Sequence, residues 1–543
     1  MTMQARRQTR SAAHTWALVL LSAGIAARLV RYALDFPLWG DEAFVAVDFL
    51  FRDYAGFLKP FTYGQIIPLF YSWGTLAVSK LAGTSEFGLR LLPLVASVLS
   101  LALFWRFAKA HATRWAAALA VGFLGSAYYP IRHAVEVKPY ATDLLTSLVL
   151  TMVAWGVWRN PRSAARWCGL VVLATLAPWC SYPAIFVCGA IAVFLAVRWR
   201  RADGPAAEPN YRAAPAGLVL GPARIGTVAF SLMFVASFVW MYEVYGHPQA
   251  EFGAHLIEIR MWTESFPPIR RFWELPLWLI TTHAGNMLAY PNGGKNGGSV
   301  VTLICVIAGV VTLWRTNRPL LLLLLGPLPL NFIAAAMERY PYGSTVRVSM
   351  YLAPAICLLA GIGLEALLRT FVAPSRVRRS AHIAAAVLGL FAAGSVVIDL
   401  VQPYKKEANY VSRQTVRDLA ADSNPGDRWI IFNSLRQEID YAPWIASWKG
   451  DGAQFIYYVT RLSRAEVLWA PRAEEITPNQ RGRTLLLAFR GANFPVFSQT
   501  QFDAYLARLE ATLGTPTKNT HVLQVKFERE WQVIDVFSWA GSE

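Results

Sequence analysis

Charged residues are scarce in this chain. Asp, Glu, Lys and Arg make up 16% of the 543 residues, whereas hydrophobic residues make up 55%. This balance excludes an ordinary water-soluble globular protein of this length. Uncharged apolar segments of about 15 to 20 residues recur up to residue 400 and then stop. The composition therefore predicts a polytopic α-helical membrane protein that ends in a soluble domain.

Cysteine is also rare, and none of it lies in a loop. The chain has five cysteines. All of them fall inside the apolar segments, without paired spacing: Cys168, Cys180, Cys188, Cys305 and Cys357. This pattern indicates neither a disulfide framework nor a cysteine metal site.

Acidic residues are fewer than basic ones, 34 against 51, which gives a formal net charge of +17. In a soluble protein this charge would suggest a nucleic-acid partner. Here the basic residues sit mainly in the short connections between apolar segments, which is the pattern that orients a membrane protein. No basic face with interleaved aromatic residues is present, so we expect no nucleic-acid partner.

About eleven segments are apolar and long enough to cross a membrane. They are residues 14–33, 87–106, 115–132, 140–158, 167–180, 182–198, 225–244, 298–314, 319–337, 348–368 and 381–400. A cytoplasmic N-terminus puts every basic connection between them on the cytoplasmic side. Two further apolar stretches are Ile66–Leu81 and Leu275–Tyr290. If only Leu275–Tyr290 crossed the membrane, the basic cluster Arg369–Arg379 would lie outside the cytoplasm. We predict that both are amphipathic juxtamembrane or re-entrant segments.

The composition changes near residue 402, which divides the chain into a membrane domain, residues 1–402, and an external domain, residues 403–543. Strand-like runs cover Arg428–Phe432, Glu466–Trp469, Thr484–Phe489, His521–Phe527 and Trp531–Phe537. A helix is expected at Ser498–Leu513. The second domain should be a small α/β domain. No glycine-rich phosphate loop opens any of its helices, so we assign it no chemistry.

Two adjacent carboxylates follow the first apolar segment, in Trp39-Gly40-Asp41-Glu42. Ionisable residues at a membrane boundary are costly, and for that reason they indicate function. A carboxylate there can accept a proton from a hydroxyl group, bind a divalent cation such as Mg²⁺ or Mn²⁺, or cap a helix N-terminus. The residues alone leave these three roles open.

Other polar groups are expected on the same external face. Lys59-Pro60 precedes the amphipathic run that begins at Ile66, and a cation beside an apolar groove suits an anionic lipid. The segment Arg132–Tyr140 brings cations and Glu136 to the mouth of the bundle, either for binding or as an internally paired cap. The loop 245–297 carries His and Glu residues, but we favour an exposed helix over a metal site there. These residues are His247, Glu251, His255, Glu258 and His283.

The order of these motifs resembles that of bacterial polyprenyl-phosphate-sugar glycosyltransferases. The matching segments are Trp39–Glu42, Lys59-Pro60, Phe87–Pro93, Glu136–Tyr140, and Arg339-Tyr340-Pro341 through Leu352-Ala353-Pro354. These enzymes belong to the GT-C superfamily of membrane glycosyltransferases, which includes the protein O-mannosyltransferases and the lipid A aminoarabinose transferase. The resemblance covers most of residues 15–400 and is specific to the superfamily rather than to a substrate.

The resemblance implies a GT-C fold in a bacterial inner membrane, and a sugar transferred from a polyprenyl-phosphate donor to a hydroxyl of a lipid, glycan or protein. It gives Asp41 the role of catalytic base or cation ligand, with Glu42 beside it. The donor phosphate would be bound by Lys59, Arg132, Lys138 and Arg347. Substrate would also contact Tyr63, Glu136 and Tyr140. Lys138 stands where the family often has Arg, which weakens the case for a bidentate phosphate clamp there.

Two other classes of function fit part of this pattern. A lipid or glycan transporter also places charges near the membrane, but such proteins often contain repeated halves, and we detect no repeat. An inactive scaffold that recruits partners through its C-terminal domain is the third class. The presence of both Asp41 and Lys59 favours the glycosyltransferase over the scaffold.

Overall fold

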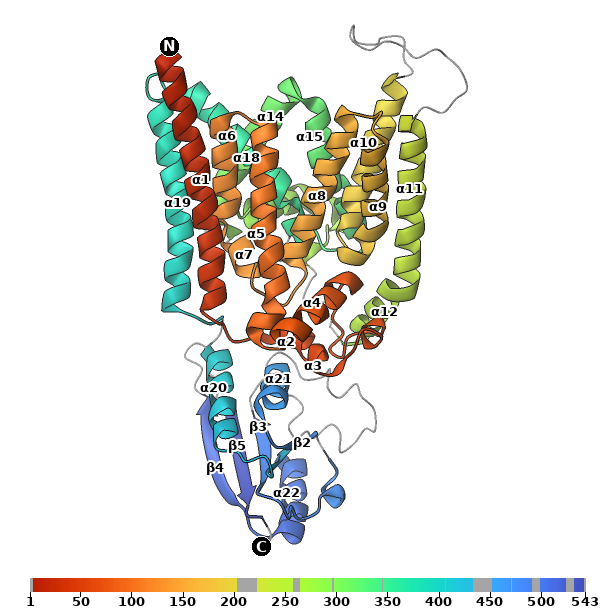
Figure 1. Ribbon diagram of the computed structural model, residues 1–543, viewed down its shortest axis with the longest axis vertical. Coiled ribbons are helices and arrows are strands. Elements are labelled where there is room, and N and C mark those ends of the chain that lie inside the picture. The colour runs from red at the N-terminus through yellow and green to blue at the C-terminus, as the bar shows by residue number, and fades with distance from the viewer. Residues whose placement is uncertain are drawn as a thin grey trace.

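The computed structural model forms a helical bundle with a sheet-containing domain beyond one end. The N-terminus lies at the opposite end of the bundle (Figure 1). The described residues are 3–202, 222–256, 264–294, 297–343, 345–405, 407–432, 452–469, 471–490, 499–523 and 532–541.

Apolar helices of different lengths build the bundle. They are α1 (Met3–Ala33), α5 (Glu86–His111), α6 (Arg114–Gly125), α8 (Tyr140–Arg159), α9 (Ala164–Cys180), α10 (Ala184–Ala202), α11 (Pro222–Met241), α14 (Gly298–Thr316), α15 (Arg318–Leu325), α16 (Pro327–Ala336), α18 (Ala353–Phe371) and α19 (Val377–Val401). Eight continuous helical stretches of the described residues are long and apolar enough to cross a membrane, and three more are shorter. Each of the eleven predicted segments coincides with one of these. The polytopic helical fold is confirmed, and the number of crossings stays a prediction.

The chain also contains short helices, and several of them lie at the end of the bundle that carries the second domain (Figure 1). They include α2 (Gly40–Ala46), α3 (Asp48–Phe51), α4 (Leu69–Ala82), α7 (Tyr128–His133), α12 (His247–Leu256), α13 (Leu275–Thr282) and α17 (Val346–Ser349). The 3-10 turns η1 (Gly56–Leu58), η4 (Ile269–Glu274) and η7 (Met350–Leu352) and the π turns η2 (Tyr242–Gly246) and η5 (His283–Met287) connect them. The helices α4 and α13 have 14 and 8 residues. Both are shorter than the ~20 residues that a span needs.

The segment 115–132 differs from its prediction as a single helix. The helix α6 ends at Gly125, and α7 begins at Tyr128. The Tyr128 amide donates to the carbonyl of Pro291 at 2.9 Å, so it cannot continue the helical hydrogen-bond ladder. The break places α7 next to α8 as a separate short helix.

Glycines bring α18 into close contact with α14. An added Cβ at Gly363 would lie 1.7 Å from the carbonyl oxygen of Cys305, and one at Gly309 would lie 2.1 Å from that of Leu359. Small residues at these positions let the two backbones approach, as is common between membrane helices.

We expect Gly363→Ala to destabilise the protein by about 1–3 kcal/mol, because the added methyl group must push the two helices apart. The matched control is Gly169→Ala on α9, where no atom lies within 4 Å of the added Cβ. That change should stabilise by up to about 1 kcal/mol through helix propensity. Thermal unfolding of both variants in one detergent checks the pair. A Gly363→Ala protein as stable as the wild type would contradict the close packing.

The C-terminal domain contains a five-stranded mixed sheet with the order β2-β1-β3-β5-β4. The strands are β1 (Arg428–Ile431), β2 (Glu466–Trp469), β3 (Thr484–Arg490), β4 (Thr517–Leu523) and β5 (Gln532–Trp539). Its helices are α20 (Glu407–Ala421), α21 (Gly452–Leu462) and α22 (Gln499–Leu513), with the turn η10 at Ala473–Glu475. The strand β1 runs parallel to β2 and β3, whereas β5 is antiparallel to its neighbours. Each of the five predicted strands overlaps one of these.

Buried ion pairs hold this domain against the bundle. Glu86, at the start of α5, contacts Arg413 of α20 at 3.3 Å and Arg461 of α21 at 2.6 Å. Arg413 also contacts Asp35 at 3.0 Å, and the Leu38 amide donates to the Tyr458 hydroxyl at 2.9 Å. The loop that leads into α2 is therefore fixed by helices from the other domain.

Candidate active site

The segment Trp39-Gly40-Asp41-Glu42, the acid motif, leads into α2 and forms its first turn. The peptide N–H groups of Glu42 and Ala43 both donate to the carbonyl of Trp39 at 2.9 Å, which starts the helix directly after Trp39. The two carboxylates lie in its first turn, where acidic residues are favourable. Adjacent positions on a helix point in different directions, so Asp41 and Glu42 meet different surroundings.

Glu42 is enclosed by protein, with only 1% of its surface exposed. Arg90 of α5 binds both carboxylate oxygens, at 2.8 and 2.7 Å. The Val137 amide donates to the same carboxylate at 3.0 Å. Burial raises the pKa of Glu42, although Arg90 opposes that effect. Glu42 thus ties α2 to α5 and to the turn before α8.

Asp41 is the carboxylate of the motif that solvent reaches, since 30% of its side chain is exposed. Its partner is Arg347 of α17, whose guanidinium donates to the Asp41 carboxylate. These residues are 306 positions apart in the sequence. Their pairing therefore depends on tertiary folding.

The turn between α7 and α8 adds further charges. Glu136 is buried and receives Arg132 Nε at 3.0 Å and His133 Nδ1 at 2.6 Å. Burial alone would raise the pKa of Glu136, but His133 and Arg132 outweigh it and hold that pKa well below its usual range. Burial lowers the pKa of Lys138 to about 8, while Asp41 opposes and Arg347 adds to this shift. Lys138 is thus within electrostatic reach of the Asp41–Arg347 pair.

Gln65 connects this turn to one of the predicted tyrosines. Lys138 Nζ donates to the Gln65 side-chain oxygen, and Gln65 donates to the carbonyl of Tyr63 at 3.3 Å. The Tyr63 ring packs against Phe44 of α2 at 5.1 Å between centroids. Within the described part of the chain its buried hydroxyl has no hydrogen-bond partner. Tyr140 begins α8, and its ring lies 5.0 Å from that of His133.

Lys59 lies apart from these contacts. It follows the turn η1 with an exposed side chain, and its carbonyl accepts from Arg52 at 3.1 Å. None of the ion pairs found among the described residues involves its ammonium group. The structure thus connects Asp41, Arg132, Glu136, Lys138, Tyr140 and Arg347, but it does not bring Lys59 into contact with them.

One residue of this group was missed by the sequence analysis. Lys405, in the linker between α19 and α20, lies over the ring of Trp39. The sequence signal was a lysine pair at the start of the soluble domain, which reads as an ordinary linker. Only the folded arrangement shows that this linker returns to the acid motif.

Among the described residues, including those of the loop 245–297, no three His, Cys, Asp or Glu residues are arranged so that they could hold a metal ion. His247 pairs with Glu251 at 3.5 Å on the surface. His283 bonds to the Tyr342 hydroxyl at 3.3 Å. The side chains of His255 and Glu258 lie outside the described residues.

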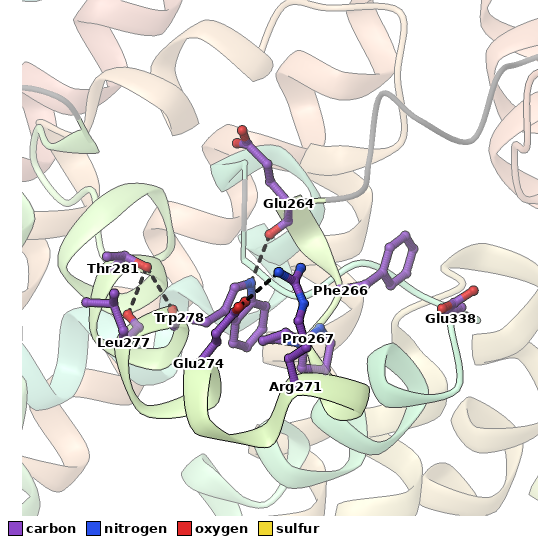
Figure 2. A pocket seen from close by; sticks show the side chains of 10 residues that line it. Glu264, Phe266, Pro267, Arg271, Glu274, Leu277, Trp278, Thr281 and Glu338 are labelled. Atoms are coloured by element: carbon purple, nitrogen blue, oxygen red, sulfur yellow. Dashed lines mark hydrogen bonds and ion pairs between the residues drawn. The ribbon is translucent and has the colours of Figure 1, made fainter.

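A cavity of about 550 Å³ lies beside this loop, between η4, α13 and the turn at Glu338. Figure 2 shows Arg271 paired with Glu274 and the Trp278 indole donating to the carbonyl of Glu264. None of the residues that line this cavity is one of the connected residues around Asp41, which are Asp41, Arg132, Glu136, Lys138, Tyr140 and Arg347. The cavity is therefore separate from the site around Asp41.

Comparisons with known proteins agree with the fold. Residues 67–206 match the family model described as Dolichyl-phosphate-mannose-protein mannosyltransferase. This matched range includes Arg132–Tyr140 but not Asp41 or Arg347. No curated protein sequence matches the chain.

Among solved structures, the chain is similar to ArnT from Cupriavidus metallidurans bound to undecaprenyl phosphate. The identity is 14% and the TM-score 0.54, over 96% of this chain and 98% of that chain. The apo structure of ArnT gives 14% identity and a TM-score of 0.54, over 97% and 98%. The likeness establishes the fold. With the family-model match, it confirms the predicted resemblance to the GT-C membrane glycosyltransferases.

Proposed function

We propose that this chain, a membrane glycosyltransferase with the GT-C fold, transfers a sugar from a polyprenyl-phosphate donor to a hydroxyl acceptor at the external face of a bacterial inner membrane. Asp41 is the general base. The observation that carries this proposal is the position of Asp41, a partly exposed carboxylate beside Arg347 and within electrostatic reach of Lys138. The N-terminus would lie in the cytoplasm and the C-terminal domain outside.

The charge of the group supports a phosphate ligand. Besides Lys405, the residues Arg132, Lys138 and Arg347 contribute three cations, against the two carboxylates of Asp41 and Glu136. Glu42 is matched by Arg90 and does not enter this balance. The surplus positive charge suits the single negative charge of a lipid-linked sugar phosphate. It also suits the charge that grows on the phosphate as the sugar leaves.

The reaction follows from these positions. Asp41 takes the proton of the acceptor hydroxyl while that oxygen forms a bond to the anomeric carbon of the sugar. The bond from that carbon to the phosphate oxygen breaks, and its electron pair stays on the polyprenyl phosphate. Attack from the opposite side inverts the anomeric configuration. A shift of Arg347 from Asp41 toward the leaving phosphate would free the base and stabilise the product.

The other predicted residues take supporting roles. Glu42 positions α2 rather than touching substrate, because Arg90 and Val137 occupy its oxygens. Tyr63, which packs against Phe44 of α2, and Tyr140, which begins α8, would contact the sugar. Lys59, which is exposed directly after η1, would meet the donor at the membrane surface. We assign no metal ion, and Mg²⁺ or Mn²⁺ dependence is open to direct measurement.

The test uses the full chain in proteoliposomes with radiolabelled undecaprenyl-phosphate-linked sugars and a hydroxyl acceptor. We expect lipid-dependent transfer and release of undecaprenyl phosphate, with no turnover of nucleotide sugars. EDTA added to the same assay reports on metal dependence. Movement of the intact lipid-linked sugar between leaflets without bond cleavage would favour the transporter and contradict the proposal.

A further inference from the structure

Three cationic side chains lie close to the ring of Trp39. Lys405 Nζ lies over its face. The guanidinium carbons of Arg132 and Arg347 lie 5.8 and 6.0 Å from the ring centroid. The three cations come from the interdomain linker, from α7 and from α17, so only the complete fold assembles them.

Lys405 is the cation of this set without a matching carboxylate. Arg132 pairs with Glu136, and Arg347 pairs with Asp41. Within the described ranges, Lys405 makes no ion pair. A cation–π contact contributes about 0.5–2 kcal/mol, but two guanidinium groups nearby repel the ammonium. An anion between the three groups would relieve this repulsion.

The pKa of Lys405 is lowered, as expected for a buried cation that no carboxylate of the described residues pairs with. Burial lowers the pKa of Lys405 to about 7, and Arg132 adds to that shift while Glu136 and Asp41 oppose it. The indole N–H of Trp39 is also buried and has no hydrogen-bond partner within the described part of the chain. The ring thus offers a further donor beside the cations.

The linker is held in place on both sides of Lys405. At the end of α19, Asp399 forms a buried ion pair with Arg31 of α1. On α20, Arg413 binds Asp35 and Glu86. Lys405 is therefore fixed above Trp39 by the docking of the C-terminal domain.

We propose that Lys405 is a phosphate-binding residue of the active site, which receives the donor phosphate together with Arg132 and Arg347 over the Trp39 ring. The linker to the C-terminal domain is then part of the site rather than a passive connection. This inference rests on the proposed function, since it takes a polyprenyl phosphate as the ligand.

The experiment compares binding of undecaprenyl phosphate and undecaprenol to the full chain in nanodiscs. Lys405→Gln removes the charge, and Lys405→Arg keeps it. The matched control is Lys109→Gln. Lys109 also lies over an indole ring, that of Trp105 at 5.1 Å, but it is near the C-terminal end of α5, whereas Glu86 and Arg90 near the site are at the N-terminal end. Unfolding temperatures are measured for every variant.

We expect Lys405→Gln to raise the Kd for undecaprenyl phosphate about 10-fold, as for the loss of one charge-assisted hydrogen bond. Lys405→Arg should recover most of that loss, and Lys109→Gln should have no effect. Undecaprenol should bind equally to all variants, because it lacks the phosphate. If Lys405→Gln lowers the unfolding temperature, Lys405→Met keeps the stem over Trp39 and should show the same loss.

Two outcomes would overturn the role of Lys405. One is an unchanged Kd for undecaprenyl phosphate in both neutral variants. The other is an equal loss for undecaprenol, which would indicate damage to the lipid groove instead. A wild-type protein that does not prefer undecaprenyl phosphate over undecaprenol would contradict the proposed function itself.

Discussion

Asp41→Asn is expected to leave a folded protein whose transfer rate is about 10²–10⁴-fold lower, because a positioned general base contributes that much. Asn retains the size of Asp and can still accept a hydrogen bond from Arg347, but it cannot take the acceptor proton. The side chain is 30% exposed, and a partly exposed ion pair contributes about 0–1 kcal/mol. Stability should therefore change little while kcat falls.

The control for Asp41→Asn is Asp53→Asn, an exposed carboxylate on the loop before η1. Its Oδ1 accepts the Gly56 amide at 2.7 Å, a bond that Asn can also make. We expect normal transfer from this variant. Donor binding by Asp41→Asn should stay close to that of the wild type. An Asp41→Asn protein that keeps more than about a tenth of the wild-type kcat would exclude Asp41 as the base.

Much of the membrane fold could be predicted from hydrophobicity, because each long uncharged segment has few alternatives to a helix. The break at Ser126 could not, since it depends on a hydrogen bond from Tyr128 to the carbonyl of Pro291, far along the chain. The strands of the C-terminal domain followed from their short apolar runs. Their order in the sheet required the structure.

The candidate site divides in the same way. Asp41 and the segment Arg132–Tyr140 were identified by motifs. Folding brings them together, because the carboxylate of Glu42 accepts a hydrogen bond from the Val137 amide. Arg90 lies in Phe87–Pro93, which resembles the family, yet nothing in the local sequence shows that this arginine is buried and paired with Glu42. Lys405 was missed because its position is set by the docking of two separate domains. Lys59 had a convincing motif, but its side chain is exposed and makes no ion pair with the described residues.

The second large effect concerns the buried ion pair between Arg90 and Glu42. Arg90→Met is expected to destabilise the protein by about 3–5 kcal/mol, because it leaves the Glu42 carboxylate buried and uncompensated. The pair is 4% and 1% exposed, so water cannot replace the lost partner. The loss should appear in thermal and denaturant unfolding. Transfer should also slow, since α2 carries Asp41.

A second change separates the charge from the packing. Glu42→Gln in the Arg90→Met background removes the unpaired charge and should recover a large part of the lost stability, which a double-mutant cycle measures. Arg271→Met is the matched control, because Arg271 pairs with Glu274 at 2.9 Å but is 65% exposed. Its cost should be at most about 1 kcal/mol. If Arg90→Met costs no more than that, the Glu42 carboxylate does not depend on Arg90, and α2 must be held to the bundle by its apolar contacts and by the C-terminal domain.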